Sequence, residues 1–116
     1  MPPLFPDVVA EAVVEVAAFC KCRVPPSLRE QVRLEPAVRG RSVTIVELRP
    51  PWHPNLGSEW TRLQIAQLRF AEPAGWSLFW RDSSERWHRY ESVPASRDLA
   101  LLLAEIDSDP TGIFWG

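Results

Sequence analysis

The stretch WSLFWRDSSERWHRY, residues 76–90, has two aromatic-rich runs on either side of a short polar segment. Trp76, Leu78 and Trp80 alternate with other residues, which is the period of a β-strand with one buried face. We predict a β-hairpin closed by the four-residue loop 82–85, so that Trp80 lies opposite Trp87. Burying a large side chain contributes about 2–3 kcal/mol, whereas a cross-strand pair contributes less than about 1 kcal/mol, so burial sets this register.

This register gives the hairpin two faces. One face is apolar and holds Trp76, Leu78, Trp80 and Trp87, with Arg89 as the exception. The other face holds Ser77, Phe79, Arg81, Arg86, His88 and Tyr90. We interpret the tryptophans as core residues. The second face is the possible ligand surface, because two directly opposed arginines repel each other unless an anion or a nearby acid lies between them.

Three further segments are predicted to form strands: residues 32–38 (VRLEPAV), 42–50 (SVTIVELRP) and 60–70 (WTRLQIAQLRF). Pro36 cannot donate a backbone hydrogen bond, which predicts that the first of them is an edge strand or is broken at this residue. In the third, the alternation of apolar residues slips between Ile65 and Ala66, which predicts a β-bulge or burial on both faces.

Helices are predicted at both ends of the chain. Apolar residues recur at helical spacing after Pro6, and Pro25 and Pro26 require this helix to end by Val24. The second helix begins after Ser96 as N-cap and ends at Asp109. Its apolar face consists of Leu99, Leu102, Leu103 and Ile106. We expect Phe114 and Trp115 to dock against the body of the protein.

The resulting fold class is α+β, an antiparallel β-meander of four or five strands flanked by an N-terminal and a C-terminal helix. The length of 116 residues predicts one compact domain over residues 1–116. The longest apolar run is too short to span a membrane, and the first residues do not resemble a secretory signal. We therefore expect a cytoplasmic protein, in which Cys20 and Cys22 are reduced.

Seven residues form the candidate ligand site: Glu47, Arg49, Trp52, Arg81, Arg86, His88 and Tyr90. Glu47 and Arg49 lie two apart on a strand and share a face, and Trp52 offers a ring on which an arginine can stack. Together they could clamp a carboxylate, a phosphate or a peptide. The alternative is an internal Glu–Arg pair beneath a tryptophan, with the remaining arginines paired to neighbouring carboxylates.

Catalytic and metal-binding motifs give little support for an enzyme. Cys20, Cys22, His53 and His88 are possible zinc ligands, but their spacing differs from that of the common structural sites, so we expect neither a metal nor a cofactor. No nucleophile elbow, phosphate-binding glycine loop or zinc-protease motif occurs in the sequence. An enzymatic alternative has His88 as a general base oriented by Glu47 or Glu85.

Two non-enzymatic functions stay open. The first is a small protein-interaction or regulatory module, with self-association through the N-terminal helix at Val9 and Val13 as one form of contact. A helix that is apolar on more than one side has two surfaces to cover. The second is binding of nucleic acid or a phosphate ligand on the face bearing Arg49, Arg81, Arg86 and His88. The net charge of −2 gives no overall attraction to nucleic acid.

Several motifs resemble an uncharacterised bacterial family, domain of unknown function 3024. They are VTIVELRPPW, WSLFWRDSSERWHRYESVP and the closing IFWG. The most specific positions are Glu47, Arg49, Pro50, Trp52, Trp76, Trp80, Trp87, His88 and Tyr90. The resemblance spans residues 5–116, but Cys22 and His53 are not among the positions that characterise the family. It implies a single compact domain and carries no activity, cofactor or partner over to this chain.

Overall fold

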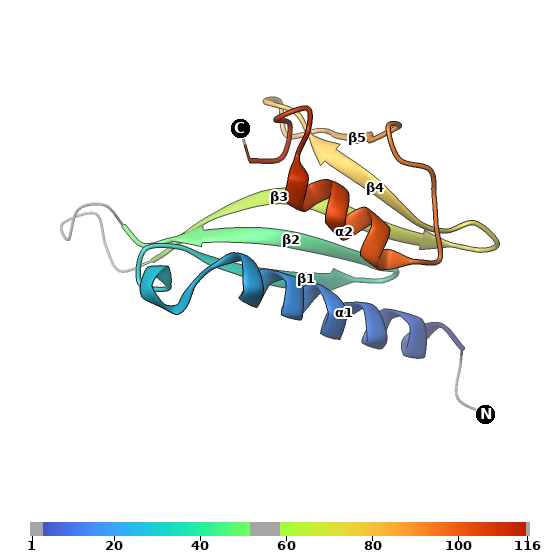
Figure 1. Ribbon diagram of the computed structural model, residues 1–116, viewed down its shortest axis with the longest axis horizontal. Helices are drawn as coiled ribbons and strands as arrows, with labels where there is room; N and C mark the ends of the chain where they lie inside the picture. The colour runs from blue at the N-terminus through green and yellow to red at the C-terminus, as the bar shows by residue number, and fades with distance from the viewer. Residues whose placement is uncertain (1–3, 52–58, 116) are drawn as a thin grey trace.

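The computed structural model describes residues 4–51 and 59–115, with side chains from residue 8 onward. It consists of a long N-terminal helix, a five-stranded sheet and a shorter C-terminal helix (Figure 1). The elements are α1 (Leu4–Arg23), the 3-10 turn η1 (Pro26–Leu28), β1 (Arg33–Arg39), β2 (Ser42–Arg49), β3 (Thr61–Ala71), β4 (Gly75–Arg81), β5 (Trp87–Arg89) and α2 (Leu99–Ser108). The predicted α+β class is confirmed.

The strands pair in sequence order, β1-β2-β3-β4-β5, and every neighbouring pair is antiparallel. β1 is an edge strand and continues through Pro36, so of the two predicted alternatives the edge position is confirmed and the break is wrong. The pairing of β2 with β3 shifts between Ile45 and Val46, so that Ile65 is the extra residue on β3. Ile65 and Ala66 are both buried, which confirms the predicted bulge.

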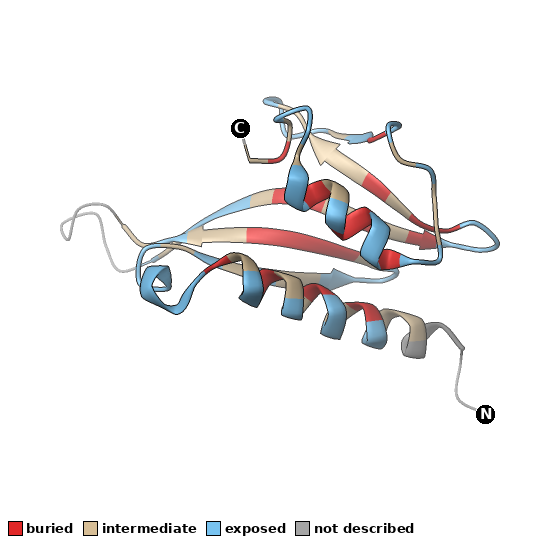
Figure 2. Ribbon diagram, in the orientation of Figure 1, coloured by how far each residue is buried: buried red, intermediate tan, exposed pale blue. Residues whose placement is uncertain are grey.

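Both helices cover the same face of the sheet (Figure 1). The residues that α1 and α2 turn toward the sheet are buried, and their outer surfaces are exposed (Figure 2). One hydrophobic core joins the two helices to β2, β3 and β4. Its fully buried side chains include Val16, Val43, Ile45, Leu68, Leu78, Leu102 and Ile106. Neither described helix is long and apolar enough to cross a membrane.

The N-cap of α2 is Asp98, two residues later than predicted. The Asp98 side chain accepts a hydrogen bond from the backbone N–H of Ala100 at 3.2 Å, whereas the Ser96 hydroxyl accepts one from the N–H of Asp98 at 3.0 Å. Ser96 is held instead by the sheet, since its N–H and carbonyl pair with those of Trp76. The four predicted apolar residues of α2 are all buried.

The C-terminal segment folds back onto the core, as expected. The Asp109 carboxylate accepts hydrogen bonds from the backbone N–H groups of Phe114 and Trp115, at 3.1 and 2.9 Å. The indole N–H of Trp115 donates to the carbonyl of Ile106 at 2.7 Å. Phe114 is buried and its ring lies 5.1 Å from the ring of Tyr90.

The hairpin of β4 and β5 has a register one residue away from the prediction. Trp80 pairs with His88 and Arg81 pairs with Trp87, so the predicted opposition of Trp80 to Trp87 is wrong. Five residues, 82–86, separate the paired Arg81 and Trp87, instead of the predicted four. Within them, the N–H of Asp82 donates to the carbonyl of Arg86 at 2.9 Å and closes a three-residue tip, 83–85, in which Glu85 adopts a left-handed conformation with φ of 67°.

Candidate functional site

The predicted ligand residues occupy three separate places in the fold. At the end of β2, Arg49 Nε donates to Glu47 Oε1 at 2.8 Å, so this arginine is already paired with its neighbour on the strand. Trp52, the predicted third member of this cluster, and His53 lie outside the described residues. The described part of the cluster is therefore an internal ion pair, as in the structural alternative.

The changed register puts Arg81 and His88 on opposite faces of the sheet. Period-two alternation places His88 with Trp80 on the face that the helices cover, and Arg81 with Trp87 on the open face. Arg81 Nη2 lies 3.8 Å from Glu85 Oε2, and Arg81 Nε is buried without a hydrogen-bond partner among the described residues. The predicted single face carrying both Arg81 and His88 is thus wrong.

His88 is held by Asp82, a carboxylate that the sequence suggested as a partner for the opposed arginines and not for this histidine. His88 Nε2 lies 2.6 Å from Asp82 Oδ2, and the imidazole stacks on Trp80 with ring centroids 4.7 Å apart. Asp82 Oδ1 accepts the backbone N–H groups of Ser84 and Arg86, at 2.8 and 2.9 Å. The residue that orients His88 is therefore Asp82, not Glu47 or Glu85. An aspartate at the first position of a tight turn was the available signal, since this residue type bonds to the turn's own backbone.

The pKa of Asp82 is lowered, first by the backbone N–H of Arg86 and then by its contact with His88. The lowered folded-state pKa makes the turn more stable above the ordinary carboxyl value, and this contribution disappears as pH falls through the lowered value. We expect Asp82→Asn to destabilise the protein at pH 7 and to differ progressively less from wild type below about pH 4. Urea unfolding of both proteins across this range measures the difference. Glu30→Gln, on an exposed turn, is the control and should show no such convergence.

Tyr90 is part of the core. It is 3% exposed, and its hydroxyl donates to Glu105 Oε2 at 2.6 Å. Burial raises its pKa, with a further contribution from Glu105. Only one edge of Tyr90 borders the open cavity of about 540 Å³ beside Trp80 and His88, which Ser92 and Thr111 also line. Through its hydrogen bond to Glu105, Tyr90 connects the end of the sheet to α2.

The cysteines do not approach a histidine in the described structure. Cys20 is buried, and this burial raises the pKa of its thiol to about 11, whereas Cys22 is exposed on α1. Among the described residues, no three His, Cys, Asp or Glu side chains gather where they could hold a metal ion. A thiol with a raised pKa is a poor nucleophile at neutral pH.

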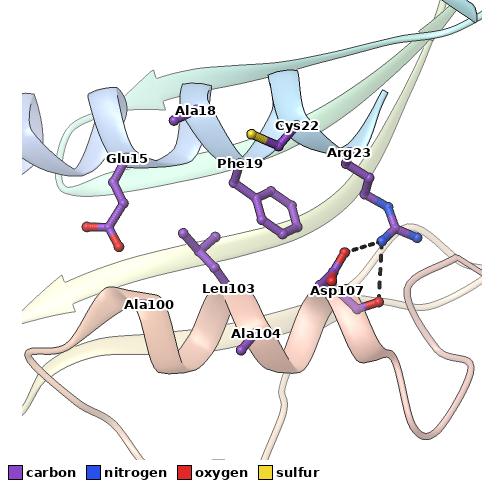
Figure 3. A pocket seen from close by; sticks show the side chains of 9 residues that line it. All are labelled: Glu15, Ala18, Phe19, Cys22, Arg23, Ala100, Leu103, Ala104 and Asp107. Carbon is purple, nitrogen blue, oxygen red and sulfur yellow. Dashed lines mark hydrogen bonds and ion pairs between the residues drawn. The ribbon is translucent and has the colours of Figure 1, made fainter. Parts of the chain in front are cut away.

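The helical layer has an open groove between α1 and α2 (Figure 3). Its volume is about 480 Å³ and its lining is mostly apolar. Phe19 from α1 and Leu103 from α2 point toward each other across it, and an ion pair of 2.6 Å between Arg23 and Asp107 closes one end. The lining residues are Glu15, Ala18, Phe19, Cys22, Arg23, Ala100, Leu103, Ala104 and Asp107.

The outer surface of α1 is apolar beside this groove. Val9 and Val13, the predicted interface residues, are half-buried, and Val13 packs against the core. Val14 is the uncovered residue, with 71% of its surface exposed. Ala10 and Ala18, one turn before and after it, are also exposed.

All of the described residues except Leu4 lie within a region of sequence similarity to one protein family. Residues 5–116 match the family described as Domain of unknown function (DUF3024). The chain belongs to this family. No curated protein and no solved structure matches the sequence. Membership in DUF3024 therefore agrees with the predicted resemblance and assigns no activity.

Proposed function

We propose that this DUF3024 protein is a non-catalytic protein-interaction module that self-associates through the outer surface of α1. The observation that carries the proposal is the exposure of Val14, 71%, at the centre of a helix whose opposite side is already buried in the core. An apolar surface on the outside of a core helix marks a protein contact when it is continuous with other apolar surface. Here it continues through Ala18 into the groove lined by Phe19 and Leu103.

A second copy of α1 complements this surface in charge. When two copies run antiparallel around a twofold axis between Val14 and Ala18, Val14 of one copy faces Ala18 of the other. The same arrangement brings Glu11 of one copy opposite Lys21 of the other, twice. Alanine and valine at the contact allow the helix axes to approach to about 8 Å. Self-association therefore covers the apolar surface and pairs the charges beside it.

The module is proposed to act in the cytoplasm, where its two free thiols stay reduced. It is proposed to need no cofactor. Binding would be regulated through the population of the dimer, because a surface used between copies is not available to another partner.

We expect Val14→Asp to convert the dimer to a monomer of 13.2 kDa. The twofold axis places two aspartates in the apolar contact, and each unpaired charge costs about 2 kcal/mol or more, so the dimer Kd rises about a thousandfold or more. Because Val14 is exposed in the monomer, the substitution should leave the fold intact. Sedimentation equilibrium or native mass spectrometry over a concentration series measures the change.

Leu63→Asp is the matched control, since Leu63 is 56% exposed and lies on β3, outside the helical layer. It should leave the mass of the assembly unchanged. A wild-type protein that stays at 13.2 kDa at every concentration would contradict self-association. A Val14→Asp dimer as stable as wild type would contradict the choice of surface.

A further inference from the structure

The face of the sheet opposite the helices carries a concentration of arginines. Since α1 and α2 both lie on one side, no described element covers the other side (Figure 1). The strand register assigns six arginines to this open face: Arg33, Arg39, Arg62, Arg69, Arg81 and Arg89. Glu35 is the one acidic residue that the described strands place there. We call this surface, from Arg33 on β1 to Arg89 on β5, the arginine face.

The charge of the arginine face differs from that of the whole molecule. The chain has 13 basic and 15 acidic residues and a net charge of −2, so an average surface is slightly acidic. On the outer surface of the helices, Arg23 and Asp107 neutralise each other, and the exposed Glu11 and Glu15 outnumber the exposed Lys21, so this side carries no excess of positive charge. Positive potential is therefore concentrated on the open sheet and attracts polyanions to that side.

Three of these arginines lie over aromatic rings. The guanidinium carbon of Arg69 is 3.9 Å from the ring centre of Phe79, and that of Arg33 is 4.4 Å from the ring centre of Trp60. Arg81 lies 5.8 Å from the ring centre of Trp87. Stacked guanidinium and aromatic planes are the surfaces on which unpaired nucleobases stack.

The other three arginines of the arginine face have no partner in residues 4–51 and 59–115. Arg39, Arg62 and Arg89 are exposed and make no hydrogen bond or ion pair with the described residues. Between them, Gln67 donates to Thr44 Oγ1 at 2.9 Å and accepts from Arg69 Nε at 2.6 Å, which fixes the polar centre of the face. The free guanidinium groups can each form two parallel hydrogen bonds with a phosphate.

From this combination we propose that the arginine face binds single-stranded nucleic acid. Phosphates pair with the exposed arginines, and bases stack on the ring-supported guanidinium groups. Five strands about 4.8 Å apart make a surface roughly 20 Å wide, whereas the major groove of DNA is about 12 Å wide and admits a helix or a two-stranded ribbon. The face is therefore too broad to enter a duplex groove and suits a strand whose bases are accessible.

This inference does not depend on self-association through α1. The arginine face and the outer surface of α1 lie on opposite sides of the protein (Figure 1). A twofold dimer through α1 leaves both arginine faces uncovered. Loss of self-association can thus be observed with nucleic-acid binding intact, and the reverse. Each chain of the Val14→Asp variant should bind nucleic acid as a chain of the wild type does.

The test is fluorescence anisotropy with labelled single-stranded DNA and RNA of about 16 nucleotides, the upper site size of sheet-based platforms. The variant is the triple substitution Arg39→Gln, Arg62→Gln and Arg89→Gln, which should not disturb folding because these side chains make no described internal contact. We expect affinity to fall at least about tenfold, and the slope of log affinity against log salt to decrease by about 2, since each phosphate contact contributes about 0.7.

A second triple variant, Lys21→Gln, Arg29→Gln and Arg86→Gln, removes the same charge from outside the arginine face. It should retain most of the affinity. Equal losses in both variants would show that net charge alone drives binding and would overturn the proposal. Three other results would also overturn the proposal. They are absence of binding by the wild type at low salt, equal affinity for duplex DNA, and displacement of the oligonucleotide by poly-glutamate at equal charge. Preference for RNA over DNA, or the reverse, identifies the natural strand and supports the proposal.

Discussion

Gly75→Ala should lower the free energy of unfolding by about 3 kcal/mol or more, a large effect for the addition of one methyl group. Gly75 begins β4 with φ of +101°, a conformation that residues with a side chain rarely adopt. A Cβ atom at this position would lie 2.7 Å from the carbonyl oxygen of Ser96 and 2.8 Å from the backbone nitrogen of Arg97. Both contacts are with backbone, which cannot rotate away.

The backbone at Ser96 is also fixed from the other side. The N–H of Trp76 donates to the carbonyl of Ser96 at 2.8 Å, and the N–H of Ser96 donates to the carbonyl of Trp76 at 2.9 Å. Relief of the clash at Gly75 would break this bridge, which positions the segment leading into α2. The cost therefore includes both conformational strain and lost hydrogen bonds.

Gly40→Ala is the matched control. Gly40 also has a positive φ, +58°, but no atom lies within 4 Å of the position that its Cβ would take. It should lose only the cost of the left-handed conformation, about 1–2 kcal/mol. Chemical unfolding of the two variants separates strain from the clash. If both lost the same stability, the close approach of Ser96 to Gly75 would have no energetic weight.

Much of the sheet could be predicted from local pattern. Alternation, β-branched residues and turn residues located the strand segments, Pro36 indicated an edge or a break, and the slip at Ile65 indicated a bulge or burial on both faces, because each of these is a property of one segment. The approach of Ser96 to Gly75 could not be predicted in this way. It joins residues 21 positions apart through backbone atoms. The glycine marks a position with no room for a side chain, but it does not reveal which distant segment approaches it.

The hairpin register shows why the candidate site was harder to predict than the fold. Apolar burial favoured a loop with an even number of residues, four. In the structure, Asp82 binds the backbone of its own turn, and Glu85 takes a left-handed conformation although it is neither glycine nor asparagine. One added residue exchanges the two faces of β5. His88 then joins Trp80 on the helix side, Trp87 joins Arg81 on the open side, and Tyr90 enters the core.

The same exchange changes which residues can act together. The sequence grouped Arg81 with Arg86 and His88, whereas the register groups Arg81 with Arg69 and Arg89. A surface spread across several strands depends on every register between them, so one error in a turn alters its membership. Self-association through α1 is less sensitive, because helical period alone places Ala10, Val14 and Ala18 on one side.

Phe114→Ala should destabilise the protein by about 3–5 kcal/mol, the other large effect that we expect. Phe114 is 6% exposed, and its ring packs 5.1 Å from that of Tyr90 in a cluster with α2. Truncation leaves a cavity that the segment cannot close, because the Asp109 carboxylate fixes the N–H groups of Phe114 and Trp115. The cavity also exposes the side of Tyr90 whose hydroxyl is bonded to Glu105.

Phe114→Leu is the control for shape and should cost under about 1.5 kcal/mol, since it retains most of the buried volume. Urea unfolding gives both values, and the near-ultraviolet absorbance change on tyrosinate formation reports the ionisation of Tyr90, since the sequence has one tyrosine. Because burial raises the Tyr90 pKa, its packing stabilises the fold fully below the ordinary tyrosine value and progressively less as pH rises through the raised one. Phe114→Ala should therefore bring the tyrosine titration closer to its ordinary value and weaken this alkaline dependence. A variant as stable as wild type, with an unchanged tyrosine titration, would mean that the C-terminal segment does not contribute to the core.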